Sequence, residues 1–175
     1  MTRADVVATH ELVGARPSYM LTFLALQAAR QGPERFAKQY PGAFLIWEPG
    51  SWQPPAGELA QTVKPRGDPS QLPRPSQLDA LCFYLGEQLG DVVKVGRSTD
   101  NDCIVGDATV GRYHLVLSRR AAGWVVQPEG GRRVLLLGVE VRDSAALVFG
   151  DTLQLGGVSL TFGDASLVLT RVTLS

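Results

Sequence analysis

Short apolar runs separated by polar punctuation fill the chain from about residue 79 onward. Val, Leu and Phe dominate these runs, and Gly, Asp and Asn separate them at nearly regular intervals. Short strands at such spacing are typical of an antiparallel β-sandwich or barrel. The segments expected to form strands are LCFYL (81–85), VVKVG (92–96), DCIVG (102–106), YHLVL (113–117), GWVVQ (123–127), RVLLLGVEV (133–141), ALVF (146–149), TLQLG (152–156), VSLTF (158–162) and SLVLTRVTL (166–174).

The stretch TLQLGGVSLTF shows this strand pattern most clearly. Apolar side chains alternate with Thr, Gln and Ser on both sides of a central glycine pair, residues 156–157. Successive side chains of a strand point to opposite faces, so one face is expected to be buried, with Leu153, Leu155, Leu160 and Phe162. The glycine pair supplies a compact hairpin turn between the two strands. We therefore predict a mainly β fold.

The N-terminal quarter of the chain has a helical pattern instead. Residues 18–31 are predicted to form a short, strongly apolar helix, with Ser18 as its cap and a Gly-Pro pair as its stop. A second helix is expected over 33–40, because proline suits a first helical turn. The run AFLIWE (43–48), with branched and aromatic members, favours a strand.

The apolar run MLTFLALQAA (20–29) also raises the question of a membrane segment. It is shorter than the ~20 apolar residues that cross a bilayer. The core of a secretory leader is an alternative, because Arg16 precedes the run and small alanines follow it. The preceding Asp5 and Glu11, together with the cap and stop, favour a helix of a folded protein. Such a helix needs burial, either on the sandwich or against a partner.

Residues 49–75 have the composition of a connector. Seven prolines fall in this stretch, with several Gly, Ser and Gln. Proline removes backbone donors and favours an extended chain, so neither a regular helix nor a central strand is expected. We predict three regions: a helical extension with one candidate strand at 1–48, a Pro-rich connector or long loop at 49–75, and a β-sandwich at 76–175.

Charge and composition argue against several classes of function. Lys plus Arg and Asp plus Glu both number 17, so no net field attracts nucleic acid or an anionic membrane. Two separated cysteines, Cys82 and Cys103, suit buried thiols in a reducing compartment, so a cytoplasmic location is expected. The chain has no phosphate-cradling, zinc-protease or nucleophile-elbow motif and no metal-ligand spacing. We therefore expect no enzyme, no cofactor and no metal site.

Three glycine-containing motifs lie in the second half of the chain. They are VKVGRSTDNDCIVGD with Gly96 and Arg97, VGRYH with Arg112 and His114, and LVFGDTLQLGGVSLTF with Gly150 and Asp151. Together, over roughly residues 80–163, they resemble the forkhead-associated (FHA) domain. The resemblance implies an antiparallel β-sandwich of the FHA/SMAD type whose loops at one end bind phosphothreonine peptides. It implies a phosphate contact for Arg97 and structural roles for Gly96, His114, Gly150 and Asp151.

Two departures from the family pattern bear on ligand binding. Gly111 stands where the family has a serine that binds phosphate, and glycine offers only its backbone N–H. A hydrogen bond to a charged group contributes about 1.5–3 kcal/mol, so its loss lowers affinity about tenfold to hundredfold. The family's asparagine-glycine-threonine turn, which holds the peptide backbone, is also absent. Arg132, Arg133 and Val134 occupy about that region.

The candidate ligand residues surround these two departures. Arg97 can fork onto two phosphate oxygens, or it can pair with a loop aspartate at position 100, 102 or 107. Ser98 and Thr109 offer hydroxyls that could replace the missing serine. Arg112, Arg132 and Arg133 could form a basic rim for an acidic or phosphorylated partner. The candidates for ligand or peptide binding are thus Arg97, Ser98, Thr109, Gly111, Arg112, Arg132 and Arg133.

The combined pattern predicts a non-catalytic, FHA-like protein–protein interaction module that does not depend on phosphothreonine. The resemblance implies an adaptor of bacterial signalling or secretion. Two alternatives stay open. One is a working phosphothreonine reader that uses Arg97, Arg112 and backbone N–H groups. The other is a structural subunit that forms homo-oligomers through an exposed edge strand at 166–174.

Overall fold

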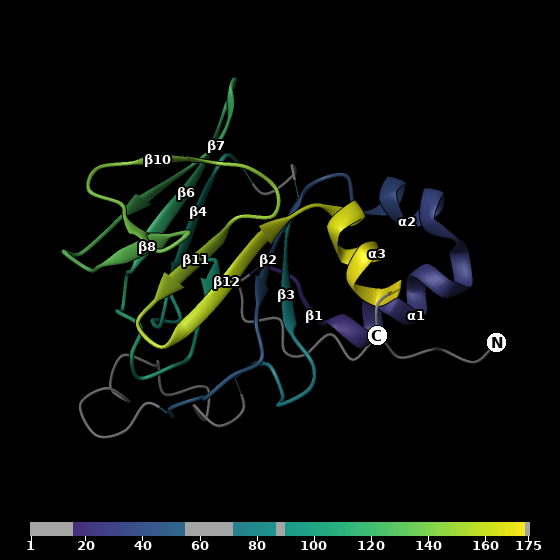
Figure 1. The fold of residues 1–175 in the computed structure, drawn as a ribbon, viewed down its shortest axis with the longest axis horizontal. Helices are drawn as coiled ribbons and strands as arrows, with labels where there is room; N and C mark the ends of the chain where they lie inside the picture. Colours follow the sequence, from purple (N-terminus) through teal and green to yellow (C-terminus); the bar gives the residue numbers. More distant parts are fainter. Residues whose placement is uncertain (1–15, 55–71, 87–89, 174–175) are drawn as a thin grey trace.

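The computed structural model describes residues 16–54, 72–86 and 90–173. Two β-sheets face each other in these ranges, and helices cover the outer side of one of them (Figure 1). The seven-stranded sheet has the order β1 (Ser18–Met20), β3 (Leu81–Leu85), β2 (Ala43–Trp47), β12 (Val158–Gly163), β11 (Thr152–Leu155), β8 (Val134–Leu136) and β9 (Val139–Glu140). The five-stranded sheet has the order β10 (Ala145–Leu147), β7 (Gly123–Pro128), β6 (Leu115–Arg120), β4 (Val92–Gly96) and β5 (Cys103–Ile104).

The architecture is the predicted mainly β sandwich. Every strand pair is antiparallel except β4 with β5, which are parallel. The predicted hairpin is confirmed, since Leu153 faces Leu160 and Leu155 faces Val158 across β11 and β12. One apolar core fills the space between the sheets, with Leu45 and Leu153 from one sheet and Leu117 from the other.

Strand β2 is buried on both faces, which explains why the AFLIW run contains no polar residue. All five of its side chains are buried. Leu45 and Trp47 point into the core between the sheets, whereas Phe44 and Ile46 belong to a second apolar cluster on the outer face. A strand buried on both faces reads as a continuous apolar run.

Three helices form the layer over this outer face: α1 (Leu21–Gln31), α2 (Pro33–Gln39) and α3 (Ala165–Thr173). Figure 1 shows them together on the side of β2 and β3. Leu24, Phe36 and Val168 are fully buried there, so the N-terminal helices cover the sandwich. Among the described residues, no helix has the length and apolar character needed to span a membrane.

The strand predicted at 166–174 is wrong, because this segment forms α3. Asp164 starts the helix: its Oδ1 accepts from the N–H of Leu167 at 3.0 Å. Ala165 and Val168, three positions apart, are buried, which is the helical period. The apolar and β-branched composition of the segment suits either structure, and packing against α1 and α2 decides between them. The oligomer alternative therefore loses the edge strand on which it was based.

The helix predicted at 18–31 begins later than expected. Its first three residues form β1, which pairs with β3, so the N-terminal extension contributes two strands to the sandwich. Ser18 is therefore not the cap of α1. The cap comes from a distant residue, since Asp79 accepts from the backbone N–H of Thr22 at 3.1 Å and from its hydroxyl.

Several predicted strand bounds also differ from the structure. The run at 133–141 is not one strand but the hairpin of β8 and β9, turned by Leu137 and Gly138 with φ of +49° and +81°. The strands expected at 102–106, 113–117 and 146–149 shorten or shift to β5, β6 and β10. Most residues at these margins belong to loops and turns of the candidate site, where side-chain hydrogen bonds replace the strand ladder.

Candidate functional site

Three connections meet at one end of the five-stranded sheet: residues 97–102, 105–114 and 129–133. We call this group the loop end. The strand register brings them together, because Val95 of β4 and Pro128 of β7 both lie opposite Leu115 of β6. Backbone bonds then join the connections, with the N–H of Arg97 donating to the Gly111 carbonyl at 2.8 Å. A Cβ at Gly96 would lie 2.3 Å from the Arg112 carbonyl oxygen, so only glycine fits there.

His114 joins two of these connections through its imidazole ring. Nδ1 accepts from the N–H of Gly111 at 2.9 Å, and Nε2 lies 2.9 Å from the carbonyl oxygen of Arg133, to which it donates. Burial is the main cause that lowers the pKa of His114, and the Arg132 charge lowers it further. The ring is therefore neutral, with its proton on Nε2. These bonds suit a structural role.

Arg97 is built into the loop end rather than extended from it. Only 2% of the residue is exposed, and its Nε donates to the Val110 carbonyl oxygen at 2.9 Å. Burial lowers the pKa of Arg97, and the charges of Arg112 and Arg132 lower it further. The buried guanidinium of Arg97 therefore lies close enough to Arg112 and Arg132 to be affected by both charges.

The loop aspartates considered as partners of Arg97 have well-defined contacts. Asp102 accepts from the N–H of Lys94 at 2.8 Å, and Asp107 accepts from the N–H of Gln53 at 2.9 Å. Asp100 accepts from the hydroxyl of Tyr113 at 3.0 Å. All three carboxylates therefore take part in fixing the shape of the loops.

Gly111 provides a seat for the side chain of Arg132. A Cβ built on Gly111 would lie 2.8 Å from Cγ and Nε of Arg132 and 3.1 Å from its Cδ. The N–H of Gly111 is bonded to His114, so the expectation that it offers this N–H to a ligand is wrong. Gly130 and Gly131, with φ of +65° and +67°, form the tight turn that brings Arg132 back over Gly111.

The two candidate hydroxyls have different surroundings. Thr109 donates its hydroxyl proton to Asp107 Oδ1 at 2.6 Å, and its Oγ1 accepts from the N–H of Gly157 at 2.8 Å. This residue therefore fastens the β11–β12 turn to the loop end. Ser98 is buried, and its Oγ lies 3.5 Å from the N–H of Asp100, which donates to it.

The three arginines of the predicted rim differ in their surroundings. Arg133 Nε lies 3.8 Å from Glu140 Oε2, so part of its charge is compensated. Arg112 and Arg132 are exposed, and within the described ranges neither guanidinium has an acidic partner. Arg112 and Arg132 thus carry exposed positive charge at the loop end, and Arg97 lies buried beside them.

Two features that sequence reasoning missed hold the loop end in place. Asn101 is buried, and its Nδ2 donates to the carbonyl oxygens of Ser98 (2.8 Å) and Arg112 (2.7 Å). The connector also contributes: Trp52 Nε1 donates to the Gly106 carbonyl at 2.9 Å. In the sequence, the asparagine within the polar loop and the tryptophan beside prolines were the only indications of these contacts.

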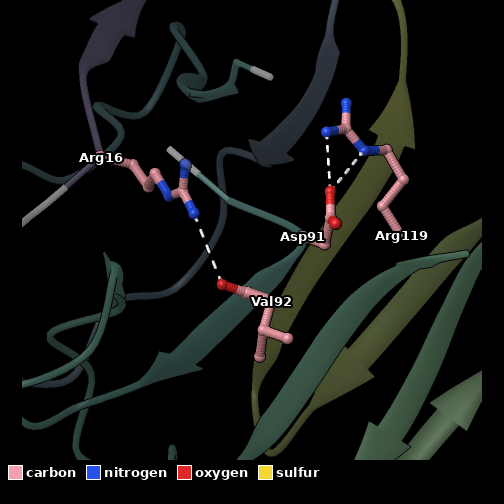
Figure 2. A network of polar contacts seen from close by, with 4 residues as sticks. All are labelled: Arg16, Asp91, Val92 and Arg119. Carbon is pink, nitrogen blue, oxygen red and sulfur yellow. Dashed lines mark hydrogen bonds and ion pairs between the residues drawn. The ribbon is translucent and has the colours of Figure 1, made fainter. Parts of the chain in front are cut away.

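Other charged and polar groups have structural contacts. Arg16 and Arg119 are shown in Figure 2, where Arg16 Nη2 donates to the Val92 carbonyl at 3.5 Å. Arg119 donates from Nη2 and Nε to Asp91 Oδ1 at 2.8 and 3.1 Å. Asp151 accepts from the N–H of Val148 at 2.9 Å in the turn that Gly150 (φ +105°) allows.

No metal-binding cluster of His, Cys, Asp or Glu occurs among the residues that the structure describes. Cys82 and Cys103 are free thiols, and burial raises the pKa of both. Buried thiols of raised pKa are poor nucleophiles, because the reactive species is the thiolate.

Comparison with known proteins agrees with the motif pattern. The family model described as "FHA domain" matches residues 93–156. Among solved structures, the Slr1951 protein from Synechocystis sp. is 18% identical (TM-score 0.47, 70% of this chain and 95% of that chain). An FHA domain from Arabidopsis thaliana is 23% identical (TM-score 0.47, 70% of this chain and 85% of that chain).

A further match is Mycobacterium tuberculosis EmbR in complex with a low-affinity phosphopeptide, at 24% identity and a TM-score of 0.40. That match covers 42% of this chain and only 20% of EmbR. Comparison with curated protein sequences gave no match. The family-model match over residues 93–156 confirms the resemblance to the FHA domain.

Proposed function

We propose that this protein is a non-catalytic protein-interaction module whose loop end binds an acidic or phosphorylated segment of a partner protein. The supporting observation is the group of arginines. Arg112 and Arg132 are exposed and lack an acidic partner within the described part of the chain, and Arg97 lies buried beside them. Bringing like charges together is unfavourable, and a bound anion relieves that repulsion.

Recognition in this proposal depends on negative charge rather than on phosphothreonine. No serine hydroxyl stands at position 111, and the hydroxyl of Thr109 is engaged by Asp107 and Gly157. The alternative, a phosphothreonine reader using Arg97, Arg112 and backbone N–H groups, is less well supported. It loses the Gly111 N–H, which is donated to His114, and Arg97 is almost fully buried.

The proposed setting is the cytoplasm, where the module acts as an adaptor without a cofactor. Both cysteines are unpaired and buried, which suits a reducing compartment. The equal numbers of acidic and basic residues, 17 of each, give no overall attraction to nucleic acid or an anionic membrane. Binding is therefore a local property of the loop end.

A set of four peptides of one sequence tests this function. The peptides carry phosphothreonine, phosphoserine, two adjacent glutamates or unmodified threonine, and fluorescence anisotropy reports binding at low and physiological salt. We expect the two phosphopeptides to bind with similar affinity, the glutamate peptide to bind more weakly, and the neutral peptide not to bind. Added salt should weaken the interaction, because exposed charges are screened over about 8–10 Å.

Arg112→Ala is expected to weaken binding, whereas Arg120→Ala is the matched control. Arg120 is also exposed but lies at the opposite end of β6, where it faces Gly123 of β7. Strong preference for phosphothreonine over phosphoserine would contradict recognition by charge. A wild-type protein that binds none of the anionic peptides would contradict the proposed site as a whole.

A further inference from the structure

We propose that Arg132 takes the place of the missing hydroxyl as an anion donor of the loop end, and that glycine at position 111 is what makes this replacement possible. This inference rests on the proposed function, because it names a group that holds the anion. In this view, the absence of a hydroxyl at position 111 is coupled to the arginine at position 132. Gly111 and Arg132 are then one recognition element contributed by two loops.

The side chain of Arg132 packs over the backbone of Gly111. Any residue other than glycine at position 111 would add a Cβ atom. That atom would lie only 2.8–3.1 Å from Cγ, Cδ and Nε of Arg132. Outside its own residue and the two chain neighbours, a Cβ atom essentially never lies closer than 3.0 Å to a heavy atom. A larger residue at 111 must therefore push the stem of Arg132 aside, and the guanidinium moves with it.

A tight glycine turn positions Arg132 over Gly111. The N–H of Glu129 donates to the His114 carbonyl at 2.9 Å, and the N–H of Arg132 donates to the Glu129 carbonyl at 3.2 Å. Between them, Gly130 and Gly131 adopt left-handed φ values of +65° and +67°, which glycine adopts readily. A Cβ at Gly130 would lie 3.0 Å from the Tyr113 carbonyl oxygen, so the turn packs directly on the chain beside Gly111.

The positive charge of Arg132 acts on its neighbours in the loop end. It lies close enough to Arg97 and to His114 to lower the pKa of both. Within the described residues it has no carboxylate of its own, in contrast to Arg133, which lies 3.8 Å from Glu140. Arg132 therefore adds its charge to the group formed by Arg97 and Arg112.

The chemistry of the two donors differs in a way that defines the ligand. A serine hydroxyl gives one hydrogen bond, whereas a guanidinium offers a planar fork of N–H groups that matches two oxygens of a phosphoryl group or carboxylate. With two exposed guanidinium groups, the site suits a dianion. Its preferred ligand is a phosphomonoester on any side chain, with clustered carboxylates as the weaker equivalent.

The test measures how the phosphothreonine and phosphoserine peptides bind to Arg132→Ala, Arg132→Lys and the control Arg133→Ala. Arg132→Ala should weaken binding about tenfold to hundredfold, the loss of a charge-assisted hydrogen bond. Arg132→Lys keeps the charge without the fork and should fall between wild type and Arg132→Ala. Arg133→Ala should change the dissociation constant by no more than about twofold, since exposed pairs contribute little.

Whether substitution of Gly111 strengthens or weakens peptide binding distinguishes the two explanations most clearly. If the hydroxyl were the missing donor, Gly111→Ser would strengthen binding. Because Arg132 occupies the space, we expect Gly111→Ser and Gly111→Ala to weaken binding alike, while circular dichroism shows a folded protein. Should the Gly111 variants fail to fold, the Arg132 series decides the question alone.

Two outcomes would overturn the inference. One is tighter binding by Gly111→Ser. The other is unchanged binding by Arg132→Ala while Arg112→Ala weakens it, in which case the proposed function survives without this element. If wild-type protein binds no anionic peptide, the inference and the proposed function fail together.

Discussion

Protonation of His114 is expected to destabilise the folded protein and loosen the loop end. The ring is 2% exposed, and its Nδ1 accepts from the Gly111 N–H at 2.9 Å. A proton on Nδ1 would set two donors against each other in a buried place, beside the charge of Arg132. Burial, and to a smaller extent the charge of Arg132, lowers the pKa of His114 from its ordinary 6.5, so the neutral ring is favoured.

The pH dependence follows from the direction of this shift. In the unfolded chain the histidine takes up its proton as pH falls through about 6.5, whereas the folded protein resists protonation until lower pH. Between these two pKa values the unfolded state binds more protons, so the free energy of unfolding falls as pH falls. For this single group, the free energy of unfolding falls by at most about 1.4 kcal/mol for each pH unit. Well above pH 6.5 the histidine is neutral in both states, so its titration no longer changes the free energy of unfolding.

Urea unfolding at a series of pH values from 8 to 5.5 measures this slope. His114→Gln is the comparison variant: it is less stable at every pH but should lack the histidine-dependent part of the decline. Carboxylates titrate mainly below this range, so their effect on the difference is small. Parallel curves for wild type and His114→Gln would refute the assignment of a buried, neutral imidazole.

Three further changes test other parts of the structure by urea unfolding. Thr109→Val removes the hydrogen bonds to Asp107 and Gly157 and should lower the free energy of unfolding by about 2–4 kcal/mol; a loss below 0.5 kcal/mol, the scale of a surface change, would contradict this. Leu137→Asn should raise stability by roughly 1 kcal/mol, since leucine is strained at φ +49° and Asn-Gly suits this two-residue turn. Val139→Asn, at an exposed strand position nearby, is its control and should give no gain. Val168→Ala should lower stability by about 2 kcal/mol if α3 packs on the sheet, whereas an unchanged midpoint would argue against that packing.

Local pattern was sufficient for the elements whose neighbours in sequence are also their neighbours in space. The hairpin of β11 and β12 could be predicted with its buried face, because strict alternation and a glycine pair allow one register. The run at 166–174 could not be assigned, since its apolar and β-branched residues suit a strand or a helix. Contact with α1 and α2, far away in the sequence, made it a helix.

The candidate site divides in the same way. By itself the sequence determined that position 111 has no hydroxyl, that the family's asparagine turn is absent and that several arginines lie near both. The folded structure was needed to show that the Gly111 N–H is bonded to His114, that Thr109 fastens another turn, and that the side chain of Arg132 packs over Gly111. The physical reason is that a sequence lists the donors and charges of each loop separately. Which of them remain available to a ligand depends on partners that the folded chain brings from other loops.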